Sequence, residues 1–488
     1  MHVLLATSEL NPYSKTGGLA DMVSALAKAL AGGAVGQALR VSVVTPLYRG
    51  MAAAHAGIGA TPWRLAIPVG DSLVEGRFHR RDLSANLTHW FVEQPGFFDR
   101  PGLYGEGGRD HADNAARFIF LSRAALVLAR HLPDPPRVVH AHDWQTALIP
   151  LLARHDQVHA GWSLPPKMVV TIHNLAFQGA FPASSWGLTG LPADWLHLES
   201  ALHHDRVNFL KAGLTQAHAI TTVSPTYARE ILTPEHGCGL EGLLLKRYND
   251  LGGILNGVDT EEWNPSSDPD LPARFHAGDL SGKAVCKAAL QREVGLPEDS
   301  AIPVLANISR LTEQKGSALI ASTVRDLLEA GESFQFVQLG SGERALENAF
   351  RDLARRFPDR VAARIGFDAA LSHRIEAAAD FYLMPSRFEP CGLNQLYSLR
   401  YGAVPVVRAT GGLQDSVVDP RENAALATGI KFTPYTGPAL NRAILKALAL
   451  WKEPAWLAHL RHNGMTADFS WEKQSAEYVA LYESVCRE

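Results

Sequence analysis

The string Thr-Gly-Gly-Leu-x-Asp occurs twice, at residues 16–21 and again at residues 410–415. Each copy follows a short apolar run, residues 3–6 or 404–407, and opens a stretch with helical character. Glycines at a helix start let its free amide groups approach a phosphate or a carboxylate closely. Paired glycines also occur in plain strand-to-helix turns. Two copies together favour function and predict two anion sites, one in each half of the chain.

Two cations follow the apolar run of residues 304–308. Arg310 and Lys315 lie five residues apart, and Gly316 comes next. Arginine offers a planar fork and lysine a mobile point charge, so the pair suits a diphosphate and would neutralise charge on a leaving phosphate. Isolated surface charges would carry no such role. Their position at a strand end favours a site.

A carboxylate and a glycine turn follow the apolar run of residues 381–384. Glu389 precedes Pro390 there, and Cys391, Gly392 and Leu393 come next. The carboxylate could bind sugar hydroxyls or stabilise positive charge. The amides of the glycine turn could hold phosphate oxygens at the following helix start. A plain turn is the alternative.

Polar side chains also end two apolar runs of the first half. His140, His142 and Asp143 follow one run, and His173 and Asn174 follow the other. The HxHD spacing can supply metal ligands, but no clear third or fourth ligand shares the cluster, so we predict no metal. Hydrogen bonding to a polyhydroxylated substrate fits better. His140 and His142 also suit the role of core residues with satisfied hydrogen bonds.

Two further motifs do not support the function that they suggest. The string from Gly340 to Ala345 matches the dinucleotide pattern, but no acidic residue ends a second strand about twenty positions on, so it predicts another turn. The pair Asp268 and Asp270 has metal-binding spacing, but it lies among serines and prolines, and we expect a surface loop there.

Length and composition predict a globular enzyme of two domains. The chain has 488 residues, and 46 basic residues nearly balance 50 acidic ones. That balance gives no basic footprint for nucleic acid, and no apolar stretch approaches the ~20 residues that span a bilayer. The N-terminal residues enter a strand-like run without a basic leader, so we expect a cytoplasmic enzyme with no membrane partner. The four cysteines show neither CxxC spacing nor a disulfide framework.

Apolar runs that alternate with helical patterns predict parallel sheets in both halves. The expected fold class is α/β, with two doubly wound Rossmann-like domains that face each other across a deep cleft. Residues 1–248 would form the first domain and residues 249–467 the second, with a boundary near residues 245–255. Residues 468–488 read as an amphipathic helix. Ligands of such sheets bind beyond the strand carboxyl ends.

These motifs resemble one family closely, the bacterial glycogen synthases and plant starch synthases. The resemblance runs along nearly the whole chain, in the same order. It is carried by residues 15–21, 140–144, 173–179, 210–213, 223–228, 254–259, 309–316, 385–393 and 410–415. The family consists of retaining glucosyltransferases of the GT-B fold. The resemblance therefore implies transfer of glucose from ADP-glucose to the non-reducing 4-OH of an α-1,4-glucan, with release of ADP and no cofactor.

The resemblance also implies roles for individual residues. The first domain would face the glucan acceptor, the second would bind the nucleotide sugar, and the terminal helix would return to the first domain. Glu389, Arg310, Lys315, His173 and Asp143 would be catalytic. Other substrate contacts would come from Lys15, Gly18, Asp21, Asn174, Asn256, Phe367, Cys391, Gly392, Leu393, Thr410, Gly411 and Gly412. Phe367 stands where the family commonly has a tyrosine that stacks on adenine.

Three positions depart from the wider pattern. Gln145 stands where a histidine is common, and Asn394 where a threonine is common. The wider fold has a second carboxylate eight positions after the first, but here that position is Tyr397, as in this branch. Retaining glycosidases use two close carboxylates, and no such pair is evident here. We therefore favour a front-face mechanism in which the departing phosphate accepts the acceptor's proton.

Three alternatives stay open at this stage. The same fold could use UDP-glucose with sugar phosphate or another small acceptor. A catalytically silent protein could bind sugar nucleotide or glucan for sensing, although Lys15, Arg310, Lys315 and Glu389 are all present. The string from Gly340 onward would suggest an NAD-dependent enzyme, and we expect no nicotinamide binding.

Overall fold

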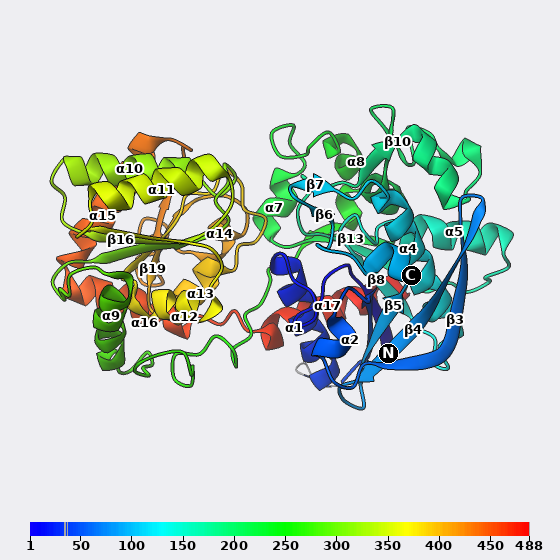
Figure 1. Cartoon of the computed structure of the whole chain (residues 1–488), viewed down its shortest axis with the longest axis horizontal. Coiled ribbons are helices and arrows are strands. Elements are labelled where there is room, and N and C mark those ends of the chain that lie inside the picture. Colours follow the sequence, from blue (N-terminus) through cyan, green and yellow to red (C-terminus); the bar gives the residue numbers. More distant parts are fainter. Residues whose placement is uncertain (34–35, 37, 488) are drawn as a thin grey trace. The chain divides into compact units, whose positions relative to one another are not determined.

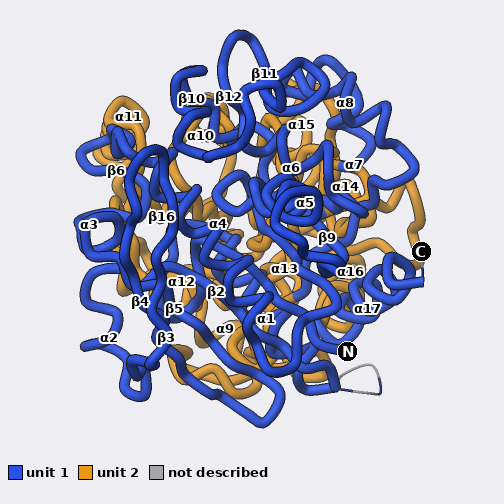
Figure 2. Tube along the Cα trace, turned by 90° about the vertical axis from the view of Figure 1, so that its right-hand side faces the viewer, with its two compact units in different colours: residues 1–223, 228–257, 471–488 blue, residues 224–227, 258–470 orange. Residues whose placement is uncertain are grey.

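A computed structural model describes residues 1–33, 36 and 38–487, which form two compact units (Figure 2). Unit 1 comprises Met1–Val223, Ala228–Gly257 and Trp471–Glu488, and unit 2 comprises Ser224–Tyr227 and Val258–Ser470. The sequence analysis expected domains at residues 1–248 and 249–467, with 468–488 as a terminal helix. The chain passes from unit 1 to unit 2 between Gly257 and Val258, and it returns to unit 1 at Trp471.

Unit 1 is built on a nine-stranded sheet (Figure 1). In spatial order its strands are β14 (Leu251–Gly253), β13 (Ala219–Thr222), β9 (Lys167–Ile172), β8 (Val138–His142), β1 (His2–Ala6), β2 (Arg40–Pro46), β5 (Leu87–Glu93), β4 (Ser72–Asp82) and β3 (Gly59–Val69). The strands from β14 to β5 pair in parallel. Every residue of β1 and β8 is buried, as expected of parallel strands that are covered on both faces.

The edge of this sheet is antiparallel, which the sequence analysis did not predict. Strand β4 runs against both β3 and β5. In β3, Leu65, Ile67 and Val69 are buried while their neighbours are exposed, which is the alternation of a half-covered antiparallel strand. Polar residues interrupt β3 and β4, so continuous apolar runs do not reveal this extension.

Helices and short elements complete unit 1. Two small sheets pair β10 (Ala180–Pro182) and β11 (Leu202–His203) with β12 (Arg206–Asn208), and β6 (Gly105–Glu106) with β7 (Arg109–Asp110). The helices are α1 (Gly18–Gly32), α2 (Met51–Ala54), α3 (Pro95–Phe98), α4 (Asn114–His131), α5 (Ile149–His159), α6 (Phe209–Gln216), α8 (Glu241–Lys246), α17 (Trp471–Arg487) and the 3₁₀ turns η1 (Ala183–Thr189), η2 (Ala193–Trp195) and η3 (Tyr248–Asp250). Helix α7 (Pro225–Glu230) has its first residues in unit 2 and its last in unit 1.

Unit 2 contains a six-stranded parallel sheet with helices on both faces (Figure 1). In spatial order its strands are β17 (Val361–Ile365), β16 (Gln335–Gly340), β15 (Val304–Ile308), β18 (Phe381–Met384), β19 (Val404–Arg408) and β20 (Ile430–Phe432). The helices are α9 (Ser281–Val294), α10 (Ser317–Glu329), α11 (Arg344–Arg356), α12 (Ala369–Ala378), α13 (Asn394–Arg400), α14 (Gly411–Ser416), α15 (Gly437–Trp451) and α16 (Pro454–Thr466). The doubly wound arrangement predicted for this half is confirmed.

Successive residues of the unit 2 strands point into different cores. Leu305 packs with residues of α10, α11 and α15, whereas Val304 and Ala306 pack with residues of α9 and α12. Such alternation across a strand places one core on each face of the sheet. Packing on both faces therefore holds the carboxyl ends of these strands in fixed positions.

The terminal helix packs within unit 1. Helix α17 contacts α1 and buries Trp471, Tyr478 and Tyr482 on one face. A Cβ on Gly257 would lie 2.8 Å from the Trp471 ring, so this crossing requires a glycine. A search of the described residues finds no helix with both the length and the apolarity needed to cross a membrane.

Candidate active site

In unit 1, the first Thr-Gly-Gly string is bound by a carboxylate of the chain itself. Glu9, three residues beyond β1, accepts hydrogen bonds from the backbone N–H groups of Thr16 (2.6 Å) and Gly17 (3.3 Å) through Oε2. Its Oε1 accepts from the Thr16 hydroxyl (2.6 Å) and the Tyr104 hydroxyl (2.7 Å). The predicted anion-binding amides are thus occupied in this structure by Glu9, which the sequence analysis missed.

Lys15 and Gly18 flank this string. The side chain of Lys15 is partly exposed and its Nζ lies 2.8 Å from Asp21 Oδ1. Burial raises the pKa of Asp21, although Lys15 favours the charged form. Gly18 is the first residue of α1, and no side chain caps this helix start. A cation and an exposed helix start therefore stand side by side, as an anion site requires.

Asp143 and His173 are joined at the ends of the neighbouring strands β8 and β9. The Asp143 Oδ1 accepts the backbone N–H of His173 at 2.7 Å. Asp143 adopts a left-handed backbone with φ of 57°, a conformation that is rare outside glycine and is concentrated at functional sites. Burial raises the pKa of Asp143 to about 7, against the backbone N–H groups of His173 and Asn174, which favour the carboxylate. The predicted residues Asp143, His173 and Asn174 form one cluster.

The other two histidines, His140 and His142, lie buried beside this cluster. His140 bonds Thr171 (2.6 Å) and Tyr482 of α17 (2.8 Å), which confirms its assignment as a core residue. His142 Nδ1 lies 3.0 Å from His173 Nε2, and its own Nε2 is buried and has no hydrogen-bond partner among the described residues. Burial lowers the pKa of His173 to about 3, so its ring is neutral.

Asn256 ends the unit 1 part of the predicted site. It lies three residues beyond β14 and is buried, and no described residue forms a hydrogen bond with its Oδ1. A buried amide oxygen without a partner is costly and is commonly met where a ligand supplies the missing donor. Its role in substrate binding stays a prediction.

In unit 2, Lys315 and Glu389 form a tight ion pair. Lys315 Nζ lies 2.9 and 2.7 Å from the two carboxylate oxygens of Glu389. Glu389 is 4% exposed, and its Oε2 also accepts the Ser386 hydroxyl at 2.9 Å. The lysine follows β15 and the glutamate follows β18, and these two strands are neighbours in the sheet. Lys315 and Glu389, which lie in separate motifs of the sequence, thus meet beyond the carboxyl ends of two neighbouring strands.

Glycines allow the loops that follow these strands to pack closely together. Gly316 has φ of 72°, and a Cβ there would lie 2.5 Å from the Pro385 carbonyl oxygen. The string from Gly340 connects β16 to α11, where the Leu311 N–H donates to the Ser341 carbonyl at 2.9 Å and a Cβ on Gly342 would collide with the backbone of Leu311. These close contacts hold the loop that carries Arg310, whose side chain is exposed.

The segment 390–394 turns sharply into α13. Gly392 has φ of 72°, and Leu393 is the N-cap residue of α13. Cys391 is buried. Asn394 Nδ2 donates to the Ile308 carbonyl (2.7 Å) and the Tyr382 hydroxyl (2.6 Å), which links the helix start to the end of β15. This departure from the family pattern therefore anchors the turn.

The second Thr-Gly-Gly string packs directly on the Glu389 loop. Thr410 is the N-cap residue of α14, and Gly411 has φ of 45°. The Gly412 N–H donates to the carbonyls of Glu389 and Pro390, both at 3.1 Å. This amide is therefore used within the protein, as the amides of the first copy are. The string acts as a backbone brace for Glu389.

Two aromatic positions behave differently. Phe367 is 87% exposed beyond β17, so its ring is available to a ligand. Tyr397 stacks on Trp263 with ring centroids 3.7 Å apart and 5° between the planes. The position that carries a second carboxylate in the wider fold is therefore part of a packed aromatic stack here.

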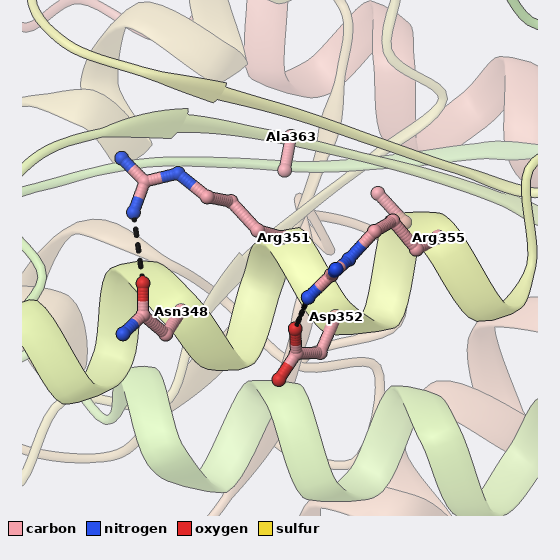
Figure 3. A pocket seen from close by; sticks show the side chains of 6 residues that line it. Asn348, Arg351, Asp352, Arg355 and Ala363 are labelled. Atoms are coloured by element: carbon pink, nitrogen blue, oxygen red, sulfur yellow. Dashed lines mark hydrogen bonds and ion pairs between the residues drawn. The ribbon is translucent and has the colours of Figure 1, made fainter.

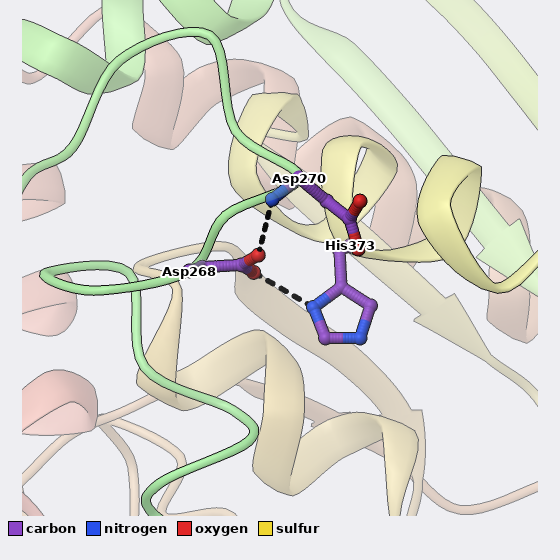
Figure 4. A group of neighbouring side chains, drawn as sticks. All are labelled: Asp268, Asp270 and His373. Carbon is purple, nitrogen blue, oxygen red and sulfur yellow. Dashed lines mark hydrogen bonds and ion pairs between the residues drawn. The ribbon is translucent and has the colours of Figure 1, made fainter.

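The pair Asp268 and Asp270 lies in a loop with mostly exposed residues, as we expected, but the Asp268 side chain points inward. Asp268 is buried, and its carboxylate accepts from the Asp270 N–H (2.9 Å) and bonds His373 Nδ1 (2.7 Å), as Figure 4 shows. The Tyr401 hydroxyl donates to it as well. The three acidic and imidazole groups lie within 4.8 Å of one another. These hydrogen bonds tie the 268–270 segment to α12, which is a structural role.

A separate surface pocket of about 680 Å³ lies on α11 and β17. Figure 3 shows that its arginines are paired along the helix, Arg351 with Asn348 and Arg355 with Asp352. None of the predicted site residues lines it.

Comparison with known proteins agrees with this arrangement. Residues 2–246 match the family described as starch synthase catalytic domain, and residues 302–449 match the glycosyl transferases group 1. The chain is 51% identical over 486 residues to a glycogen synthase of Anaeromyxobacter dehalogenans, with 99% of both chains covered.

Solved structures give the same result. The catalytic domain of starch synthase IV from Arabidopsis thaliana, bound to ADP and acarbose, superposes with a TM-score of 0.89 at 34% identity, covering 100% of this chain and 99% of that one. A sucrose-phosphate synthase from Thermosynechococcus elongatus has a TM-score of 0.60 at 17% identity, covering 99% of this chain and 98% of that one, which shows a shared fold alone.

The chain belongs to the glycogen and starch synthase family of glycosyltransferases. Its α/β fold of two doubly wound units is of the GT-B class.

Proposed function

We propose that this protein transfers glucose from ADP-glucose to the non-reducing end of an α-1,4-glucan with retention of configuration, and releases ADP. The observation that carries the proposal is the ion pair between Lys315 and the buried Glu389. It places a cation and a carboxylate beyond the carboxyl ends of the neighbouring strands β15 and β18, where ligands of open α/β sheets bind. The glycogen synthase relative and the ADP-bound starch synthase support the choice of donor and acceptor.

Arg310 and Lys315 are the electrostatic catalysts in this proposal. As the bond from glucose C1 to the diphosphate oxygen breaks, negative charge grows on the leaving ADP. Preorganised cations stabilise such charge strongly where water is excluded. In this proposal Lys15, Gly18, Cys391, Gly392 and Leu393 bind the diphosphate, and Thr410, Gly411 and Gly412 brace the Glu389 loop and supply further substrate contacts.

The glucosyl ring is held by the cluster in unit 1 and by Glu389. His173 is neutral because burial lowers its pKa, so it donates or accepts hydrogen bonds without adding charge. Asp143 and Asn174 hold the hydroxyl groups beside it. Asp21 orients Lys15 through their ion pair, Asn256 offers its buried amide, and Phe367 stacks on adenine.

Retention follows from a front-face reaction. The position of a second carboxylate is Tyr397, which is stacked on Trp263, so a double displacement has no partner for Glu389. The acceptor 4-OH forms its new bond to C1 on the face from which ADP leaves. Its proton passes to the departing diphosphate oxygen. Exclusion of water protects the donor from hydrolysis during this step.

The proposal includes the setting of the enzyme. We propose that it works in the cytoplasm on ADP-glucose and glycogen, with no cofactor, no essential metal, and neither nucleic acid nor membrane as a partner. The near balance of acidic and basic residues and the absence of a spanning helix among the described residues support this setting.

The stereochemistry provides a direct test. Maltohexaose would be elongated with ADP-glucose, and proton NMR would follow the new linkages from the first turnovers. The proposal predicts α-1,4 linkages only. New β linkages, or free glucose without elongation, would contradict it.

A further inference from the structure

Glu9 is the main polar contact of the exposed loop that carries Lys15 and Gly18. The loop residues Thr16 and Gly17 are exposed, yet the carboxylate that they contact is only 3% exposed. Among the described residues, the four hydrogen bonds of its carboxylate all go to this loop or to Tyr104. A buried carboxylate therefore accepts the hydrogen bonds that the Thr16 and Gly17 donors of this surface loop would otherwise make to water.

The loop is also held by the ion pair of Lys15 with Asp21, but this pair does not involve the Thr16–Gly17 backbone. Gly17 is the N-cap residue of α1 and brings no side chain to cap the helix, and a Cβ there would meet nothing within 4 Å. Glycines carry high conformational entropy, so this string needs an external restraint to keep one shape. Glu9 supplies that restraint from the rigid end of β1.

Glu9 is itself fixed in place. Its carbonyl accepts the Thr7 hydroxyl at 2.9 Å. Its partner Tyr104 also bonds Ser8 Oγ at 2.7 Å, and the Ser8 carbonyl accepts the Tyr48 hydroxyl at 3.0 Å. These hydrogen bonds fix the position of the carboxylate relative to β1, and the carboxylate in turn fixes the position of the loop.

We propose that Glu9 is a positioning residue for the nucleotide-sugar donor, because it holds the Thr16–Gly17 backbone so that the Lys15 ammonium and the Gly18 amide meet the diphosphate. This inference rests on the proposed function. Donor affinity depends on a preorganised loop, since a mobile loop must be ordered at the moment of binding.

The hydrogen-bond pattern allows the positioning role of Glu9 to be tested separately from its negative charge. Oε2 faces only backbone donors, whereas Oε1 faces two hydroxyls, which can turn to accept. A glutamine fits the same place, with its oxygen toward the amides and its NH₂ toward the hydroxyls of Thr16 and Tyr104. Tyr104 then donates to Ser8. A carboxamide therefore preserves the loop while it removes the negative charge.

The experiment compares Glu9→Gln, Glu9→Ala and the matched control Glu75→Ala, whose side chain is exposed on β4. Calorimetry with ADP gives the Kd, and ADP release with glycogen gives KM for ADP-glucose and kcat. We expect Glu9→Ala to raise both the Kd and the KM about tenfold or more, with a smaller change in kcat. Glu9→Gln and Glu75→Ala stay within about threefold of the wild type.

Two results would overturn the inference. Wild-type affinity in a folded Glu9→Ala variant would show that the loop needs no anchor, and equal losses in Glu9→Gln and Glu9→Ala would show that the charge matters instead. If Glu9→Ala does not fold, Thr16→Val decides: a Kd raised beyond the roughly threefold range of the controls supports the inference, and a Kd within that range overturns it. A wild-type protein that binds ADP but releases none from ADP-glucose would count against the proposed function, and the ADP affinities would still test Glu9.

Discussion

At the scale of residues, the pair Lys315 and Glu389 carries the proposed chemistry. Glu389→Ala and Lys315→Ala should each lower turnover about 100-fold or more, because each removes a group held against the developing charge. Initial rates of ADP release measure this effect, and thermal unfolding shows that the variants fold. Asp326→Ala, which removes an exposed ion pair with Arg325, is the control. Near-normal rates in both folded site variants would refute the assignment.

Asp143 should make stability depend on pH. Its pKa is about 7 in the folded protein and near its ordinary 3.8 when unfolded. Between these values the unfolded chain releases a proton that the folded chain keeps, so the free energy of unfolding contributed by Asp143 falls as pH rises from about 4 to 7. Asp143→Asn has no such proton.

The melting temperature of Asp143→Asn, relative to the wild type, should therefore rise by a few degrees from pH 4 to pH 8. Asp71→Asn, at an exposed turn, serves as the control and should show no such trend. A difference that stays flat across this range would show that Asp143 is ionised throughout.

The site residues were predictable from the sequence to different degrees. Lys315 and Glu389 each follow an apolar strand and lie in charged motifs, and the structure joins them. Glu9 was missed because an acidic residue seven positions before Thr16 has no motif of its own. Its role depends on how the loop folds back on β1, which local sequence does not reveal.

At the scale of elements, the second glycine string braces the Glu389 loop. A Cβ on Gly411 would collide with the Glu389 carbonyl, and the residue has a left-handed φ. Gly411→Ala should therefore displace Glu389 and lower kcat at least about tenfold, with a lower melting temperature. Gly437→Ala, at the start of α15 where there is space, is the matched control. Full activity in Gly411→Ala would mean that the loop tolerates the shift.

Buried strands were predicted well and the sheet edge was not. The apolar runs at residues 304–308 and 381–384 coincide with β15 and β18, because strands covered on both faces are apolar throughout. Strands β3 and β4 are covered on one face only, so polar residues interrupt them. Their identification requires the alternating pattern, which is weaker over short windows.

At the scale of the whole molecule, the last helix is fixed to the first unit by a buried hydrogen bond. Tyr482 of α17 bonds His140 of β8 at 2.8 Å. Tyr482→Phe leaves His140 Nδ1 buried without this partner, which should cost about 1–3 kcal/mol of stability. Chemical denaturation measures the loss, and Tyr248→Phe, at an exposed tyrosine, is the control. Equal stability of the two variants would show that α17 is held by apolar packing alone.

The return of this helix was expected only from the family resemblance, since an amphipathic pattern does not say which surface it covers. The GT-B class, expected on the same ground, is confirmed by the match to solved structures. Which unit binds donor and which binds acceptor stays a prediction.

The most direct measurement is the release of nucleotide diphosphate from ADP-glucose and UDP-glucose, each with and without glycogen, with EDTA present throughout. We predict rapid ADP release that depends on glycogen, and much slower release from UDP-glucose. Protein that binds ADP but releases nothing from either donor would contradict the central claim.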